Sequence, residues 1–337
     1  MAIATNTRTT YGAIGIREDL SNIIYNISPM DTPFISNVGK GSADNTLFEW
    51  QTDELTAAAA NQQLEGDDSM NALAVSEPVR LTNYCQISYK AVQTSGTAEA
   101  VDFAGRRSSQ AYQLAKRAKE IKRDMEKMLL SNDVKVAGAA GTARKTAAVM
   151  SWLGTTSAGT SNIILGSASP VVGVVNNGGS SPAVGPDGTT VASFGTSAVL
   201  TMAMINLAME RCFTLGGEPS TILAPADLKQ KISALGGSVI ADLVTNHDKA
   251  TQGTAVNAVD VLVTDFGTLK IVPSRLMLAD MLFFVDYDFW SVDYLRPFQT
   301  ETLAKTGDSI KQLMIAEYGL RAKNGLANAA IIGVKDA

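Results

Sequence analysis

The most regular hydrophobic pattern in the chain lies between residues 97 and 131. Apolar residues recur there at steps of four, three, four and three, at Leu114, Ala118, Ile121, Met125 and Met128. This spacing places them on one face of an α-helix. No proline interrupts the segment, and Ser131-Asn132-Asp133 is typical of a turn at its end. We therefore predict one long helix over about 97–131, which would measure roughly 50 Å at about 1.5 Å per residue.

A different pattern precedes this helix. Between Val79 and Gln93, apolar residues alternate with more polar neighbours, as in a half-buried strand. A shorter strand is predicted over 46–52, and an acidic, polar segment separates the two. Connections of this length in a compact protein usually have a function or are disordered. We therefore predict an extended two-stranded loop over 42–95 that reaches a neighbouring molecule.

The N-terminal residues 1–41 have the pattern of an arm. Arg17–Ile27 can form a short amphipathic helix, and the two prolines in Ser28–Pro33 end it. Phe34 and Ile35 follow, and could fix the arm to another surface. The alternative is an ordinary helix and turn at the edge of a domain.

The second half of the chain combines helical and strand patterns, so we predict the α+β class. A buried helix over 197–213 should end at Gly216-Gly217, and a helix over 226–235 should stop at Gly236-Gly237. The predicted strands cover 221–224, 259–264, 268–273, 281–286, 290–295, 311–320 and 330–334. The Gly- and Ser-rich segment 154–195 is predicted to be irregular β structure, with a mobile linker as the alternative.

Composition excludes several classes of protein. The 337 residues carry a net charge of -5, which is not the signature of a nucleic-acid-binding protein. Charged residues make up 18% of the chain, below the usual quarter, which fits a chain that hides surface against partners. We expect neither a signal peptide nor a membrane-spanning segment. Two cysteines are too few for a disulfide scaffold.

Candidate catalytic and metal-binding residues are sparse. The single histidine, His247, lies in a polar context without an accompanying nucleophile motif. Asp286 and Asp288 form a D-x-D pair, but no further cation ligands follow. We predict no catalytic residue, no cofactor and no metal. The enzymatic alternative, a hydrolase using Asp286 or Asp288, lacks supporting residues.

Basic residues outnumber acidic ones in the long predicted helix. Its cations are Arg106, Arg107, Lys116, Arg117, Lys119, Lys122, Arg123 and Lys127, against Glu99, Asp102, Glu120, Asp124 and Glu126. One interpretation is a solvated helix face with internal salt bridges. The others are a surface that faces phosphate-rich cargo or an acidic loop of a neighbour.

Several motifs together resemble a family of tailed-phage major capsid proteins. They are Arg17–Gly41, the FEWQTDEL string of Phe48–Leu55, and the segments Gly216–Ser233, Val263–Met277 and Leu295–Ser309. The resemblance covers most of the chain and is weakest over 154–195. It implies the Hong Kong 97-type capsid fold, with an N-terminal arm, an extended β-hairpin loop, a long spine helix, and peripheral and axial domains.

The resemblance also implies an organisation and a function. The expected parts are the arm at 1–41, the extended loop at 42–95, a peripheral domain with the spine helix at 96–153, an insertion at 154–195, an axial domain at 196–294, and a return to the peripheral domain at 295–337. Hexamers and pentamers would tile an icosahedral shell around double-stranded DNA, with scaffold, portal and cement proteins as further partners. The protein would be found in the virion, and in the host cytoplasm during assembly. The alternative is a tail-tube or surface-layer protein.

Contacts between subunits are the expected functional sites. Phe48 and Trp50 lie near the base of the extended loop, whose acids could meet the basic helix of a neighbour. The candidate contact residues are Arg17, Phe34, Phe48, Trp50, Asp53, Glu54, Glu65, Asp67, Asp68, Lys119 and Arg123. Some relatives form covalent cross-links from a lysine in this loop. No lysine lies between Lys40 and Lys90, so we expect a shell without that chemistry.

Overall fold

The structure is a computed structural model. It describes residues 31–53, 77–103, 105–154, 162–165, 171–172, 187–190, 194, 198–244 and 260–336, together with residues 55, 58, 60, 62 and 65. For 165, 171–172 and 236–244 only the backbone is described. The predicted helix Arg17–Ile27 and most of the segment 154–195 lie outside the described residues.

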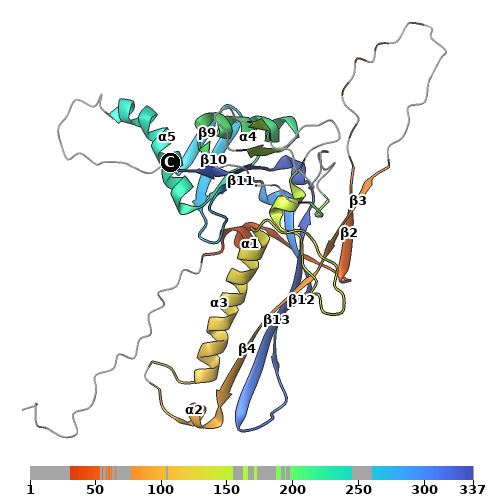
Figure 1. Cartoon of the computed structure of the whole chain (residues 1–337), viewed down its shortest axis with the longest axis vertical. Helices are drawn as coiled ribbons and strands as arrows, with labels where there is room; N and C mark the ends of the chain where they lie inside the picture. The colour runs from red at the N-terminus through yellow and green to blue at the C-terminus, as the bar shows by residue number, and fades with distance from the viewer. Residues whose placement is uncertain are drawn as a thin grey trace, which may run out of the picture.

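A four-stranded sheet forms the elongated lower part of the molecule in Figure 1. Its strands lie in the order β1 (Gly39–Ser42), β12 (Trp290–Thr302), β13 (Ser309–Ala322) and β4 (Gln86–Ser95). β1 runs parallel to β12, and the other neighbours are antiparallel. The helix α3 (Ser109–Leu129) packs along β4 and β13. Its buried residues Ile121, Met125 and Leu129 belong to the predicted apolar face or continue it.

A seven-stranded sheet forms the upper part. Its order is β6 (Val171–Val172), β5 (Ile163–Leu165), β14 (Ala329–Ile332), β11 (Met281–Val285), β8 (Thr221–Ala224), β10 (Gly267–Pro273) and β9 (Val261–Thr264). The helices α4 (Met202–Thr214) and α5 (Ala226–Val244) pack their apolar residues with those of the sheet in one cluster. Two strand pairs complete the fold: β2 (Leu47–Thr52) with β3 (Val79–Tyr84), and β7 (Ala198–Val199) with β15 (Val334–Lys335).

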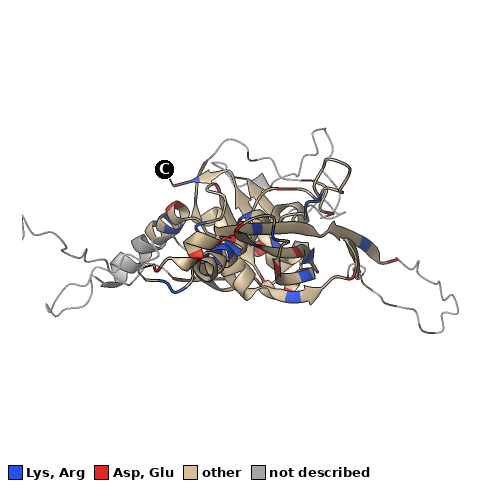
Figure 2. Cartoon of the chain, turned by 90° about the horizontal axis from the view of Figure 1, so that it is seen from below, with Lys and Arg blue, Asp and Glu red and all other residues tan. Residues whose placement is uncertain are grey.

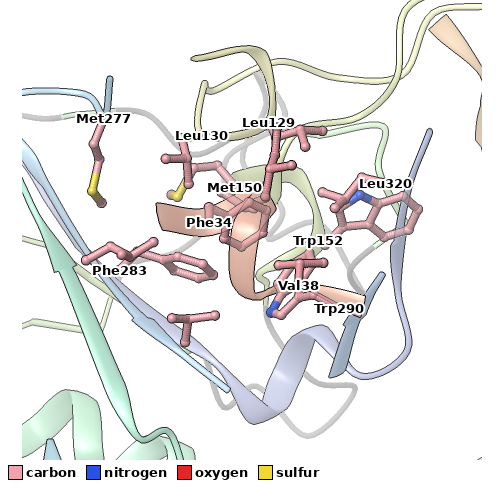
Figure 3. Packing of buried hydrophobic residues seen from close by; sticks show 14 of the residues in the cluster. Phe34, Val38, Leu129, Leu130, Met150, Trp152, Met277, Phe283, Trp290 and Leu320 are labelled. Atoms are coloured by element: carbon pink, nitrogen blue, oxygen red, sulfur yellow. The ribbon is translucent and has the colours of Figure 1, made fainter. Parts of the chain in front are cut away.

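One core joins the two sheets. The short helix α1 (Pro33–Asn37) and the 3-10 turn η2 (Val149–Trp152) insert between them. Figure 3 shows Phe34 of α1 among Met150, Leu130 and Phe283. Burying an aromatic side chain of this size contributes about 1.5–3 kcal/mol. This shared core fixes the two sheets relative to each other. Two further 3-10 turns, η3 (Tyr287–Phe289) and η4 (Gly325–Ala327), lie in the C-terminal part.

The long helix predicted over 97–131 is in fact two helices. The short α2 (Gly96–Ala100) is separated from α3 by residues 101–108. Gly105 has a φ of 75°, outside the helical region, and the Ser108 side chain accepts a hydrogen bond from the Ala111 N–H at the start of α3. The 21 residues of α3 span only about 32 Å at 1.5 Å per residue.

The strand predicted over 79–93 is also divided. It breaks at the buried residue Cys85, whose N–H donates to the Thr46 carbonyl at 2.8 Å. Before the break β3 pairs with β2, which confirms the predicted hairpin; after it β4 pairs with β13. The continuous alternating pattern over 79–93 therefore contains two strands, β3 and β4, which belong to two different sheets.

In the second half the strand predictions are confirmed, although β12 and β13 are longer than expected. The helix predicted from 197 begins at Met202, because Ala198–Val199 pairs with β15. Gly216, with a φ of 79°, confirms the predicted end. The predicted stop at Gly236-Gly237 is wrong, since α5 continues to Val244. A glycine in a helix costs only about 1 kcal/mol relative to alanine, which the packing of Leu228 and Ile232 can offset.

Candidate assembly surfaces

Aromatic residues fix the base of the β2–β3 hairpin to the four-stranded sheet. The Phe48 and Trp50 rings stack with centroids 5.6 Å apart, and the Trp50 ring lies 5.2 Å from that of Trp152. The Trp50 Nε1–H donates to the Ala322 carbonyl at 2.8 Å. Phe48 is buried within its own chain. Phe48 therefore has an intramolecular role in this structure, and its predicted contact with a neighbour stays a prediction.

Asn83 forms a second, polar attachment of the hairpin. Its Nδ2 donates to the Leu320 carbonyl at 2.6 Å and to the Thr146 Oγ1 at 3.0 Å. Its Oδ1 accepts the N–H of Ala147 at 3.0 Å and that of Tyr84 at 2.8 Å. The side chain is fully buried and has all of its amide atoms bonded. It therefore ties the hairpin to two other segments.

Two buried carboxylates accompany these attachments on the long strands. Glu317 forms ion pairs with Arg144 and Arg296. Asp293 pairs with Arg321 at 2.5 Å, and the Arg321 guanidinium lies 5.7 Å from the centre of the Phe48 ring. Both carboxylates are neutralised where they are desolvated, which is the arrangement that buried charges require. Hydrogen bonds, ion pairs and ring contacts thus join the hairpin base, called the hairpin joint below, to the four-stranded sheet.

The outer end of the hairpin is exposed. Asp53 and Glu65 are exposed, as are Leu55 and Val79. Glu54, Asp67 and Asp68 lie outside the described residues. Figure 1 shows β2 and β3 leaving the sheet in a direction that diverges from α3. Among the described residues, neither Asp53 nor Glu65 forms an ion pair with a basic residue of α3.

The helix α3 presents a basic surface to solvent. Of its residues Lys116, Lys119 and Lys127 are exposed and Arg123 is half-buried. None of these four forms an ion pair with a residue in the described ranges, whereas Asp124 pairs with Lys90 at 2.8 Å and Glu120 with Arg117 at 2.5 Å. Figure 2 shows Lys and Arg positions in blue over several elements of the chain. The surface is therefore available to an acidic partner.

Comparison with known proteins decides what these surfaces belong to. The family model of the SU10 major capsid protein matches residues 3–335. The chain belongs to this family. The major capsid protein of Escherichia phage Phieco32 is 29% identical over 352 residues, covering 96% of this chain and 95% of that protein. The function of this capsid protein is therefore structural: copies of it form the shell of a phage virion.

Solved structures show that this capsid protein has the Hong Kong 97-type fold. The cyanophage A-1(L) capsid asymmetric unit is similar with a TM-score of 0.66 at 13% identity, covering 95% of this chain and 97% of that chain. The capsid of the native GTA particle has a TM-score of 0.60 at 12% identity, covering 99% and 100%. The predicted fold class is thereby confirmed, and the family model confirms the predicted family.

The N-terminal segment of the capsid protein is attached through Phe34 and Glu126. Phe34 is fully buried, with its ring centroid 6.2 Å from those of both Phe283 and Trp290. Like Phe48, it packs within its own chain, and its predicted contact with a neighbour stays a prediction. The fully buried Glu126 carboxylate accepts the N–H of Phe34 at 2.7 Å and that of Ile35 at 2.8 Å. Arg17 lies outside the described residues.

Sequence reasoning missed Asn83, Glu126 and Glu317. Glu126 offered a signal, because it follows Met125 directly on a helix whose adjacent apolar positions are buried. An acid placed beside such a face requires partners in the folded chain. Asn83 and Glu317 lie in strands among alternating residues and offered no comparable signal.

Asp286, one of the two acids considered for catalysis, has a structural role. The Asp286 Oδ1 accepts the Asp288 N–H at 3.1 Å and so caps the turn η3. Desolvation raises the pKa of Asp286. Among the described residues, no three His, Cys, Asp or Glu side chains are grouped as metal ligands. The described part of the chain also contains no helix long and apolar enough to cross a membrane.

Proposed function

We propose that the shell is built from rings of five and six copies of this chain and encloses double-stranded DNA. The observation that carries this proposal is the hairpin joint. Its base is fixed by Trp50 and Asn83, while its outer end carries exposed Leu55 and Val79. An exposed apolar end on a rigid base is suited to packing on a second subunit. Electron microscopy of the purified chain tests the proposal, since tubes or flat sheets would contradict it.

The hairpin of one copy would lie over its neighbour, with the acidic loop against the basic helix. The acids are Asp53, Glu54, Glu65, Asp67 and Asp68, and the facing cations are Lys119 and Arg123. Opposite charges across a contact set register and partner choice more than affinity. The N-terminal arm, which includes Arg17 and precedes α1 in the chain, would connect adjacent subunits.

Charge exchange tests this pairing. The double variant K119E/R123E should lower the yield of shells, because it places acids against acids. Adding D53K and E65K in the same chain should restore assembly if the two sets face each other. A normal yield of shells from K119E/R123E alone would contradict the proposed pairing. If the variant with all four substitutions does not assemble, although circular dichroism shows that its subunits are folded, this result would also count against the pairing.

The shell is held together without covalent bonds from the loop. The absence of lysine between Lys40 and Lys90 supports this. Denaturing electrophoresis of mature particles should give a single band at the size of the monomer, and a ladder of multimers would refute it. We also propose that the protein has no catalytic activity, because Asp286 serves as a turn cap. Its further partners are scaffold, portal and cement proteins, and its place during assembly is the host cytoplasm.

A further inference from the structure

Three segments of the chain meet at the Lys135 side chain. Its Nζ donates to the Thr82 carbonyl at 2.8 Å and to the Thr82 Oγ1 at 2.9 Å, on strand β3 of the hairpin. It also donates to the carbonyl of Asp187 at 2.7 Å, in the last part of the Gly- and Ser-rich segment 154–195. An ammonium group has three N–H donors, and all three are used here. Lys135 therefore connects the hairpin to a segment that is distant in the sequence.

A short strap, residues 187–190, lies against the core next to this lysine. Its Gly188 is buried and donates its N–H to the Ser151 carbonyl at 3.1 Å, while the Gly188 carbonyl accepts the Lys135 N–H at 2.9 Å. The position requires glycine, because its φ is 76° and a Cβ there would lie only 2.9 Å from the Trp152 ring. The strap is therefore seated by a close approach of its backbone to Trp152.

The same strap borders the aromatic part of the hairpin joint. The Trp152 ring, which packs against Gly188, has its centroid 5.2 Å from that of the Trp50 ring on β2. The Lys135 Nζ lies 6.0 Å from the centre of the Trp152 ring. The strap is thus connected to both strands of the hairpin, to β2 through Trp152 and to β3 through Lys135.

The charge of Lys135 makes its three hydrogen bonds depend on one another. The side chain is half-buried, and desolvation lowers the pKa of Lys135 while the Asp187 carboxylate counteracts this. The three acceptors are uncharged oxygens, which replace the water that the ammonium loses. Hydrogen bonds from a charged donor are stronger than neutral ones, and the members of such a network support one another. Loss of one acceptor should therefore weaken the hold on the others.

We propose that the strap at 187–190 couples the end of the Gly- and Ser-rich segment to the direction of the β2–β3 hairpin, with Lys135 as the connecting residue. While the strap is seated, Lys135 holds Thr82 and the hairpin keeps one direction. When the strap lifts, Lys135 loses an acceptor and the hairpin is released. Thr189 is exposed and Gly188 alone in the strap is buried, so the strap opens more readily than the strands of the core. The coupling belongs to the single subunit, and only its use in placing the hairpin on a neighbour rests on the proposed function.

Replacing Thr82 by valine tests the coupling from the side of the hairpin. Valine keeps the shape of threonine but removes the Oγ1 acceptor, and the change lies outside the strap. In hydrogen exchange of the full-length chain before assembly, T82V should make the peptide that contains Gly188 exchange about 3- to 10-fold faster. T52V is the matched control, because Thr52 is in the same hairpin and its Oγ1 donates to the Val79 carbonyl instead. Unchanged exchange at the strap in T82V, or the same acceleration in T52V, would overturn the coupling.

Replacing Gly188 by alanine tests the coupling from the side of the strap. The new Cβ would collide with the Trp152 ring and unseat the strap, so the amides of β2 and β3 should exchange about tenfold faster or more. The amides of β11, which should keep their rates, report that the subunit is still folded. Unchanged exchange in the hairpin would overturn the coupling.

Because G188A also moves Trp152, a further variant isolates the role of Lys135. K135M alone should accelerate exchange in the hairpin, and the acceleration in K135M/G188A should be smaller than the product of the two single effects, since both act through one connection. Effects that simply multiply would overturn Lys135 as the connecting residue. All of these measurements use unassembled subunits. Wild-type chain that never forms rings or shells would therefore refute the proposed function and leave the coupling standing.

Discussion

Replacing Glu126 by alanine should release the α1 segment from α3. The carboxylate accepts two backbone hydrogen bonds at the start of α1, from Phe34 and Ile35, in a fully buried position. Alanine leaves both N–H groups without an acceptor, at about 1–3 kcal/mol for each. Removal of the buried charge offsets part of this cost. We therefore expect E126A to lower the free energy of unfolding by about 2–4 kcal/mol.

The effect should be local, and hydrogen exchange of the full-length chain before assembly can measure it. A loss of about 2–4 kcal/mol corresponds to exchange about 30- to 1,000-fold faster at the Phe34 and Ile35 amides. The amides of β13 should keep more of their protection. Unchanged exchange at both amides in E126A would refute the reasoning. It would show that packing of Phe34 alone holds the segment.

The glutamine variant removes the charge together with one of the two hydrogen bonds, because its NH2 group replaces one of the two oxygens that accept from Phe34 and Ile35. Desolvation raises the pKa of Glu126, and the N–H groups of Ile35 and Phe34 counteract this only in part. The native state therefore binds the proton more tightly than the unfolded chain. Stability from this group is complete below the ordinary pKa of about 4.3 and is lost as pH rises through the raised native value. E126Q has no proton to lose, so its stability relative to wild type should improve across this range. A constant difference between pH 4 and pH 8, measured by urea unfolding, would contradict the shift.

The hairpin joint supplies two further predictions. G319A should destabilise the subunit by about 1–3 kcal/mol, because a Cβ there would collide with the Phe48 ring; an unchanged melting temperature would contradict this. W50F should lower the free energy of unfolding by about 1 kcal/mol, because it removes the hydrogen bond to the Ala322 carbonyl. Thermal unfolding measures this change. A loss of stability larger than that of G319A would contradict an effect limited to this hydrogen bond.

The sequence predicted the elements better than their ends. Periodicity located α3 because Ile121 and Met125 face the core, but it could not place the start. The helix begins at Ser109 because Ser108 caps it and Gly105 adopts a positive φ. The cap and the positive φ are each properties of a single residue. A periodic pattern over many residues does not detect them. The break at Cys85 was hidden for a similar reason, since alternation continues through it while the partner strand changes from β2 to β13.

The candidate contacts were predictable only in part. Exposed cations on α3 followed from the helix pattern, and Lys119 is exposed as expected. The surroundings of the aromatic candidates could not be predicted, because a sequence does not show whether a phenylalanine contacts its own chain or another. Phe34 and Phe48 both pack within their own subunit.

Cryo-electron microscopy of the purified, full-length chain under assembly conditions tests the central claim most directly. We predict closed icosahedral shells made of five- and six-membered rings, with each β2–β3 hairpin lying on a neighbouring subunit. Open tubes, flat sheets, or shells whose hairpins contact only their own subunit would contradict this account.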